Sequence, residues 1–225
     1  MITLHHLEYS QSFRILWLLE ELGVEYELKL YQRDEKTKLA PLNYKVLSPL
    51  GTAPVITDEN IVISESNAII DYILDKHPSN TLRPEPGNEY RVRYLFWMHA
   101  SQGSLMPALL MSMMFRIIPE RVPFFLKPII KPVLNMANTG FTKPRLTALL
   151  KQAEADLETA DWFGGDQLTA ADISMSYPME SMRSNGTINE RHPNCLAWLD
   201  RMHMSMSFQN ALKKDGKSSF VFSFN

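Results

Sequence analysis

The spacing of apolar residues changes about a third of the way along the chain, and this change restricts the fold more than any other feature. Up to residue 77, short strand-like runs such as EYELKLY alternate with runs of helical spacing. In SFRILWLLEEL, for instance, Ile15, Leu18, Leu19 and Leu22 lie at i, i+3, i+4 and i+7. Beyond the proline-rich segment 77–88, helical patterns follow one another almost to the end of the sequence. We therefore expect a mixed α/β domain followed by an all-helical domain.

The first part of the chain predicts the order strand, helix, strand, helix, strand, strand, helix. After ITL, SFRILWLLEEL and EYELKLY come a short helix in APLNYKVL, the strands PVIT and IVIS joined by DEN, and a helix in ESNAIIDYIL. A parallel crossover followed by a hairpin gives a mixed sheet with helices on its faces, which is the thioredoxin-like βαβαββα arrangement. We place this domain at residues 1–80, a linker at 81–87 and the helical domain at 88–225. Helices are expected there in EYRVRYLFWMHASQGSLMPALLMSMMFRI, PRLTALLKQAEADLETA, AADISMSYPMESMR and CLAWLDRMHMSM.

Composition restricts the class of protein. The 225 residues are 45% hydrophobic and 21% charged, which is typical of a globular chain with a sizeable core. The formal net charge of −2 offers no basic field, so we expect no nucleic-acid partner. The most apolar segment, PFFLKPIIKPVLNM, carries two lysines and three prolines, so we expect a segment that lies on the surface or fills a gap, and no transmembrane segment. The first residues, MITLHHLEYS, lack the features of a secretory signal, and we expect a cytoplasmic protein.

Cysteine and histidine usage argues against redox and metal chemistry. The single cysteine, Cys195, cannot form an internal disulfide, and its neighbours Leu196 and Trp198 favour a packed helix. His5 and His6 are adjacent and would point to opposite faces of a strand. The remaining histidines show no ligand spacing, so we expect no metal site.

Four local stretches carry a resemblance to a known family. These are SPLGTAPVI (48–56), SESNAIIDYIL (64–74), HASQGSLMPALLM (99–111) and FGGDQLTAADISMS (163–176). In the last, Thr169 and Asp172 form a capping box, with Leu168 and Ile173 at the staple positions. Together with the two-domain layout, they resemble the cytosolic glutathione S-transferases, in particular the fungal and bacterial subgroup. The resemblance covers nearly the whole chain and is weakest in the tail KKDGKSSFVFSFN.

The resemblance implies a glutathione site on the first domain. Pro54 would be cis and would present the backbone of Ala53 to the cysteinyl part of glutathione. Glu65 and Ser66 follow Pro54 at the family's spacing and would hold the γ-glutamyl group at a helix start. Lys45 would contact the glycine end, together with the region of Thr52, where many relatives have Lys or Gln.

The stretch LEYSQSFRILW places three hydroxyl groups at the entrance to the first helix. A cysteine thiol has a pKa near 8.5, so a transferase must stabilise the thiolate, through a hydroxyl donor and the positive helix end. In the serine type of the family the hydroxyl lies about four residues before an arginine, and counting back from Arg14 reaches Ser10. Tyr9 is the alternative donor, because one branch of the family uses tyrosine. Ser12 is placed to cap the helix.

The resemblance also implies the reaction. Glutathione would be the co-substrate, and its thiolate would attack apolar electrophiles, with reduction of hydroperoxides as a further activity. Met106, Met113, Met114 and Phe115 are candidates for the electrophile wall. The alternatives are a glutathione-dependent disulfide reductase, disfavoured because no cysteine lies near Ser10, and a glutathione-binding protein without turnover. A homodimer is implied as well.

Overall fold

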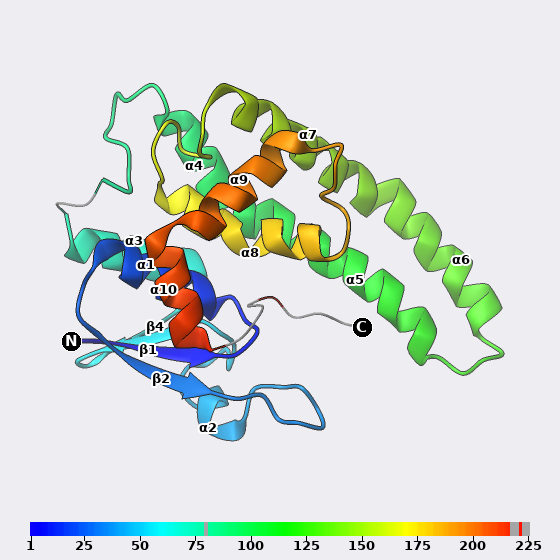
Figure 1. Ribbon diagram of the computed structural model, residues 1–225. Coiled ribbons are helices and arrows are strands. Elements are labelled where there is room, and N and C mark those ends of the chain that lie inside the picture. The colour runs from blue at the N-terminus through cyan, green and yellow to red at the C-terminus, as the bar shows by residue number, and fades with distance from the viewer. Residues whose placement is uncertain (79–80, 217–220, 222–225) are drawn as a thin grey trace.

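A four-stranded mixed sheet forms the base of the molecule in the computed structural model, which describes residues 1–78, 81–216 and 221 (Figure 1). The strands are β1 (Ile2–Leu7), β2 (Tyr26–Tyr31), β3 (Val55–Asp58) and β4 (Ile61–Ser64). Their order in the sheet is β2-β1-β3-β4. β1 pairs in parallel with β2, while β3 is antiparallel to both β1 and β4. The expected crossover followed by a hairpin is therefore confirmed.

β1 is longer than the predicted strand ITL, because it continues through His5 and His6 to Leu7. Every residue of β1 is buried. As expected for strand neighbours, His5 and His6 serve different faces: His5 contacts Tyr31 and Thr57, while His6 contacts Ser12 and Asp215. The extra residues carry the strand to the entrance of the first helix, where the candidate site lies.

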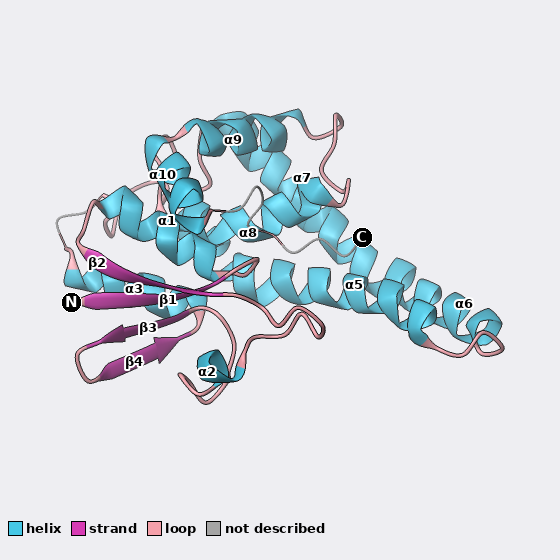
Figure 2. Ribbon diagram, turned by 60° about the horizontal axis from the view of Figure 1, so that its bottom comes forward, coloured by secondary structure: helices cyan, strands magenta, loops and turns pink. Residues whose placement is uncertain are grey.

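Three helices complete the first domain, namely α1 (Ser12–Leu22), α2 (Leu42–Lys45) and α3 (Ser66–Lys76). Figure 2 shows α1 and α3 on the side of the sheet that faces the helical domain, and α2 on the opposite side. Under α2, Tyr44 packs with Leu7 and Val55 in a small separate core. Every residue of α1 from Ser12 to Leu19 is buried. The sequence predicted one buried face, but α1 lies between the sheet and the helical domain and is covered on both sides.

The second domain is helical in the described residues, apart from loops and an isolated antiparallel bridge between Trp162 and Gly165. α4 (Arg91–Ala100) continues through a π-helical turn at Ser101–Leu105 into α5 (Met106–Arg121), as the single long pattern predicted. The others are α6 (Lys127–Ala137), which continues through a second π-helical turn at Asn138–Thr142 into α7 (Lys143–Thr159), then α8 (Ala170–Ser184), α9 (Pro193–Met204) and α10 (Met206–Asp215). The described residues between α3 and α4 form neither helix nor strand. The domain boundaries themselves stay predictions.

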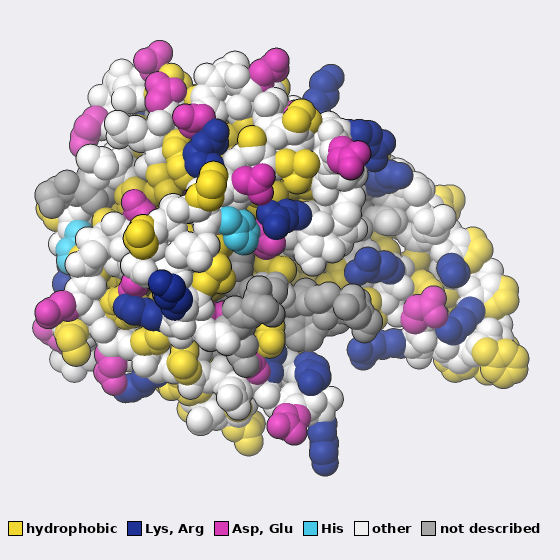
Figure 3. All heavy atoms as spheres, viewed as in Figure 1, with side chains coloured by type: hydrophobic (Ala, Val, Ile, Leu, Met, Phe, Trp, Pro, Cys, Tyr) yellow, Lys and Arg dark blue, Asp and Glu magenta, His cyan; other side chains and the backbone are white. Residues whose placement is uncertain are grey.

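α6 falls in the apolar segment that we expected to lie on the surface. It forms a helix without a single buried residue and packs along α5 (Figure 1). Pro128 sits in the first turn, where a missing N–H costs nothing, while Pro132 is inside the helix. Phe124 and Phe125, before α6, are 83% and 62% exposed. Figure 3 shows yellow apolar side chains at this end of the molecule.

α10 was missed by the sequence analysis, which ended the last helix at Met206. A separate N-cap begins it, because Ser205 Oγ accepts a hydrogen bond from the Phe208 N–H at 3.3 Å. Gly216 ends it with a φ of 70°. The tail beyond Gly216, where the family resemblance is weakest, lies outside the described residues apart from Val221.

Buried contacts join the two domains. Phe208 of α10 packs edge-on against Trp17 of α1, with ring centroids 5.3 Å apart. Asn67 of α3 accepts a hydrogen bond from Ser174 of α8 at 2.7 Å. One apolar core runs through both domains, so α1 and the site at its start are held by the helical domain as well.

The capping box at the start of α8 is confirmed. The N–H of Thr169 donates to Asp172 Oδ2 at 2.9 Å, and Leu168 packs against the core that contains Ile173. Asp172 does more than cap, since its Oδ1 also accepts from the Phe163 N–H at 2.7 Å and from Trp198 Nε1 at 2.9 Å. The box therefore ties α8, α9 and the preceding loop together.

Candidate functional site

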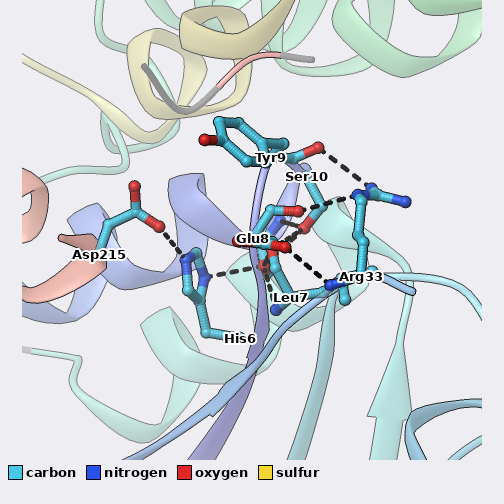
Figure 4. Close-up of polar contacts among 8 residues, drawn as sticks. His6, Leu7, Glu8, Tyr9, Ser10, Arg33 and Asp215 are labelled. Atoms are coloured by element: carbon cyan, nitrogen blue, oxygen red, sulfur yellow. Dashed lines mark hydrogen bonds and ion pairs between the residues drawn. The ribbon is translucent and has the colours of Figure 1, made fainter. Parts of the chain in front are cut away.

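The turn from β1 into α1 is held in a constrained shape. Tyr9 has a φ of 50°, which non-glycine residues rarely adopt. Arg33, after β2, fixes this turn: its guanidinium donates to the carbonyls of Glu8 at 3.0 Å and Tyr9 at 3.1 Å (Figure 4). The Arg33 N–H also donates to Glu8 Oε1 at 2.8 Å. The two residues before Ser10 are thus positioned by one arginine.

The hydroxyl groups of Ser10 and Ser12 are arranged differently from the expectation. Ser12 is the first residue of α1, and no side chain caps the helix at the preceding residue, Gln11. The Ser12 hydroxyl instead accepts from the Leu7 N–H at 3.1 Å and contacts His6 Nδ1 at 2.8 Å. Ser10 Oγ accepts from the Ser12 N–H at 3.2 Å and donates to the Leu7 carbonyl at 2.6 Å. The predicted cap at Ser12 is wrong, because β1 extends far enough for His6 to engage that hydroxyl.

A cavity of about 410 Å³ opens beside this turn. The peptide bond between Ala53 and Pro54 is cis. Ala53, just before β3, lines the cavity. Ser10, in the turn between β1 and α1, lines it as well and is only 4% exposed. The other lining residues that matter here are Gln11, Arg33, Lys45, Thr52 and Tyr177. Four residues predicted for the site, Ser10, Lys45, Thr52 and Ala53, therefore meet around one cavity.

Glu65 and Ser66 lie at the start of α3 and do not line this cavity. Glu65 is exposed and has a φ of 77°, a value that non-glycine residues rarely adopt. Ser66 is the first residue of α3 and is 3% exposed. Pro54 is buried and also does not line the cavity. These residues flank β3 and β4, the strands next to the cavity.

A second cavity, of about 540 Å³, lies between the first one and the helical domain. Tyr9 lines it, and in Figure 4 its ring points toward the helices, away from Arg33. Met106 and Met113 of α5 line it as well, whereas Met114 lines neither this cavity nor the first, and Phe115 lines a separate one between α5 and α6. Both cavities share Gln11, Arg33, Leu39 and Tyr177, so they adjoin.

Sequence reasoning missed Arg33 and Tyr177, which line both cavities. Burial lowers the pKa of Arg33 from its ordinary value. Arg14, also without an assigned role, is fully buried 5.6 Å from the Tyr177 ring, and its guanidinium makes no hydrogen bond to the described residues. Burial lowers the pKa of Arg14 to about 9. The position of Arg33 directly after a strand did not indicate a site residue, because an arginine at such a position is ordinarily exposed.

Other chemistry finds no support in the described part of the chain. Cys195 is buried in α9, and burial raises the pKa of its thiol, so it supplies no thiolate to either cavity. Within residues 1–78, 81–216 and 221, no three His, Cys, Asp or Glu side chains are grouped as metal ligands. In the same ranges, none of the helices combines the length and the apolar character that crossing a bilayer requires.

A cavity with both polar and apolar lining beside a cis-proline on a thioredoxin-like sheet, adjoining a second cavity walled by a helical domain, is the layout of a two-substrate transferase acting through glutathione. Residues 1–75 match the N-terminal domain of glutathione S-transferases, and residues 143–201 match the C-terminal domain. The chain is 32% identical to glutathione S-transferase 3 of Schizosaccharomyces pombe, over 88% of this chain and 81% of that protein.

Two further relatives agree with this assignment. Glutathione S-transferase 1 of Saccharomyces cerevisiae is 24% identical over 95% of both chains. A crystal structure of a glutathione S-transferase from Actinobacillus pleuropneumoniae superposes with a TM-score of 0.79 and 32% identity, over 96% of this chain and 93% of that one. The chain belongs to the glutathione S-transferase family, and it is a glutathione transferase.

Proposed function

We propose that this transferase is of the serine type, with glutathione as co-substrate in the 410 Å³ cavity and the Ser10 hydroxyl beside its sulfur. The observation that carries the proposal is that Ser10 and Ala53 line the same cavity, whereas Tyr9 lines the other one. A cysteinyl group paired with the backbone of Ala53 would bring its sulfur to the Ser10 side. The hydroxyl would then turn from the Leu7 carbonyl to the sulfur and stabilise the thiolate.

The remaining groups of glutathione have candidate partners on either side. Lys45 and Thr52 line the cavity and would contact the glycine carboxylate. The start of α3, with Ser66 and its backbone N–H groups, would receive the γ-glutamyl carboxylate, since the positive end of a helix attracts anions. Glu65, exposed beside it, would pair with the α-amino group.

The electrophile would occupy the 540 Å³ cavity. Its wall combines Met106, Leu109, Leu110 and Met113, flexible and apolar side chains that suit varied hydrophobic molecules. Tyr9 also lines this cavity, and its ring would contact the electrophile. We therefore expect conjugation of apolar electrophiles, with Tyr9 shaping selectivity.

The test compares Ser10→Ala with Tyr9→Phe. Glutathione affinity is measured by calorimetry, the thiol pKa of bound glutathione by thiolate absorbance, and turnover with an aryl halide. Ser10→Ala should raise the thiol pKa and lower kcat/KM roughly a hundredfold, as the loss of one preorganised donor does elsewhere. Tyr9→Phe should leave the thiol pKa unchanged. The reverse pattern would assign the thiolate donor to Tyr9.

A homodimer is also proposed. The edge strand β4 exposes Ile61 and Val62, and α4 exposes Val92, Leu95 and Phe96. Both elements lie beside α3, which contacts β4 and whose Asn67 donates to the Met98 carbonyl of α4. Exposed apolar side chains of this kind are typical of an association surface. Light scattering of the intact protein should give twice the mass of one chain, and Phe96→Glu should shift it toward the monomer; a monomeric wild type would contradict the proposal.

A further inference from the structure

A chain of hydrogen bonds runs from the last helix of the protein to Ser10. Asp215 Oδ1 of α10 lies 2.5 Å from His6 Nε2, and the other ring nitrogen, Nδ1, lies 2.8 Å from Ser12 Oγ. Ser12 Oγ in turn lies 2.7 Å from Ser10 Oγ. Figure 4 shows Asp215, His6 and the turn at Ser10 in line, although they come from the two ends of the sequence.

All four residues are buried, and Ser10 lines the 410 Å³ cavity. Asp215 is 5% exposed, Ser10 is 4% exposed, and His6 and Ser12 are still less exposed. None of the other three lines that cavity. The chain is thus shielded from solvent along its length and opens where the glutathione sulfur is proposed to lie.

Asp215 is the charged group that contacts His6. Its second oxygen, Oδ2, is buried and makes no hydrogen bond to the described residues. Several charged groups on the neighbouring elements lie against other partners. Lys214 of α10 pairs with Glu20 of α1, Lys29 of β2 with Glu27, and Asp58 of β3 with Lys76, while Arg14 of α1 faces Tyr177. A proton that reaches His6 is therefore balanced by the carboxylate of Asp215.

One arrangement of the hydrogens links the four residues, and it requires the Ser10 O–H to leave the Leu7 carbonyl. When His6 is neutral and donates from Nε2 to Asp215, its Nδ1 is an acceptor and receives the Ser12 O–H. Ser12 Oγ also accepts from the Leu7 N–H, and the Ser10 O–H donates to it once it turns from the Leu7 carbonyl, to which it otherwise donates at 2.6 Å. Ser10 Oγ accepts from the Ser12 N–H and has a second lone pair, and Ser10 lines the cavity. In this state Ser10 can accept a hydrogen bond from a thiol.

We propose that Asp215, His6, Ser12 and Ser10 form a proton relay that takes the thiol proton of bound glutathione. The proposal rests on the proposed function, in which the sulfur lies beside Ser10. The S–H bond breaks as its proton bonds to Ser10 Oγ; the former Ser10 proton passes to Ser12 Oγ, and the former Ser12 proton passes to His6 Nδ1. Sulfur keeps the electron pair as a thiolate, and His6 becomes an imidazolium between Ser12 and Asp215.

The end state of the relay is also the state that suits the thiolate. After the transfer, the Ser10 O–H points at the sulfur and donates to it, so one group first accepts the proton and then stabilises the anion. The positive charge lies on His6, paired with Asp215 in a dry interior where such pairing is strong. When the thioether product has formed, the proton returns through the same hydroxyl groups to the leaving group or to water in the cavity.

The matched variants are Asp215→Asn and Ser12→Ala, with Asp58→Asn as a control. Asp58 is likewise a buried carboxylate at the sheet, but its partners are Lys76, Tyr72 and the N-terminal ammonium group of Met1. Binding of glutathione and of S-methylglutathione is measured by calorimetry, thermal melting reports folding, and thiolate absorbance over a pH series gives the thiol pKa of bound glutathione. S-methylglutathione has no thiol proton, so its affinity reports the site without the relay.

We expect Asp215→Asn and Ser12→Ala each to raise the thiol pKa of bound glutathione by about one unit, which is a tenfold loss of thiolate below that pKa. The double variant should show no further rise, because both changes break one chain. Affinity for S-methylglutathione should stay near that of the wild type, and Asp58→Asn should alter melting alone. A merely structural clamp between α10 and β1 would lower melting in all variants and leave the thiol pKa unchanged.

Failure of the relay and failure of the proposed function give different results. If Ser10→Ala raises the thiol pKa while Asp215→Asn and Ser12→Ala do not, the relay is overturned and the serine-type site stands. If the wild type binds neither glutathione nor its S-methyl derivative, the proposed function itself is contradicted. A measurement on the wild type covers the case in which the variants do not fold. The rate of thiolate formation is measured in mixtures of light and heavy water, and its plot against deuterium content should be curved because several protons move. A straight line would overturn the relay.

Discussion

Arg33 and Tyr9 are joined by a 3.1 Å hydrogen bond from the guanidinium Nη2 to the Tyr9 carbonyl, and this contact holds the turn that carries Ser10. The same guanidinium donates to the carbonyl of Glu8 from Nε and to that of Lys38 from Nη1. A planar fork of donors can serve three acceptors at once, which an ammonium group on a flexible stem cannot do with the same geometry. The positive φ of Tyr9 is therefore stabilised by contacts to the backbone.

We expect Arg33→Lys to impair the reaction while the charge at the site is kept. The turn would relax, and Ser10 would lose its position beside the sulfur, so kcat/KM should fall roughly ten- to a hundredfold. Melting should change little, because Arg33 lies at the rim of both cavities. Steady-state kinetics with an aryl halide test this, and a lysine variant with wild-type kcat/KM would show that charge alone is needed.

Met113 and Met114 offer a neighbouring pair in which only the first lines the 540 Å³ cavity. Met113→Ala should lower kcat/KM for apolar electrophiles roughly tenfold, because contacts to the bound molecule are lost. Affinity for glutathione should be unchanged. Met114 is 43% exposed, so Met114→Ala is the control and should behave as the wild type. Equal effects of the two substitutions on kcat/KM would place the electrophile elsewhere.

The sequence predicted the elements with strong periodicity and missed those whose signals are local. SFRILWLLEEL and the long pattern at 89–117 became α1 and the continuous run from α4 to α5. α10 was missed because its signals are short: a serine cap at Ser205 and a glycine end at Gly216. α6 was not assigned because its prolines contradict a helix by propensity, although Pro128 falls in the first turn, where proline is tolerated.

Only part of the site could be predicted from the sequence, because some of its contacts join residues that are far apart along the chain. Ser10, Ala53, Lys45 and Thr52 surround one cavity, and the resemblance had pointed to each of them. That resemblance could not give the partners of Ser12. His6 and Asp215 are separated by more than two hundred residues, and nothing local in either segment indicates that α10 returns to β1. Hydrogen-bond partners across such a separation follow only from the packed structure.

Asp172→Ala should weaken folding and leave glutathione affinity intact. The carboxylate is fully buried and accepts hydrogen bonds from Phe163, Thr169 and Trp198, so its loss leaves buried donors without partners. Breaking such a network costs on the order of 3 kcal/mol or more of unfolding free energy. Urea denaturation measures this, with Asp166→Ala as an exposed control. A variant with wild-type stability but lost glutathione affinity would contradict the structural role.

The acid limb of the stability profile should depend on Asp58. A hydrogen bond from Lys76, together with one from Tyr72, lowers the pKa of Asp58 from 3.8 to about 2. Because the folded-state pKa lies below the unfolded value, this stabilisation is fully present above the unfolded pKa and is lost as the pH falls through the folded one. Asp58→Asn should therefore be less stable than the wild type at neutral pH, and the difference should shrink between about pH 4 and pH 2. Urea denaturation across that range measures it, with Asp200→Asn, an exposed residue, as the control. A difference between wild type and Asp58→Asn that stays constant down to the lowest pH would show that the ionised carboxylate contributes nothing to folding.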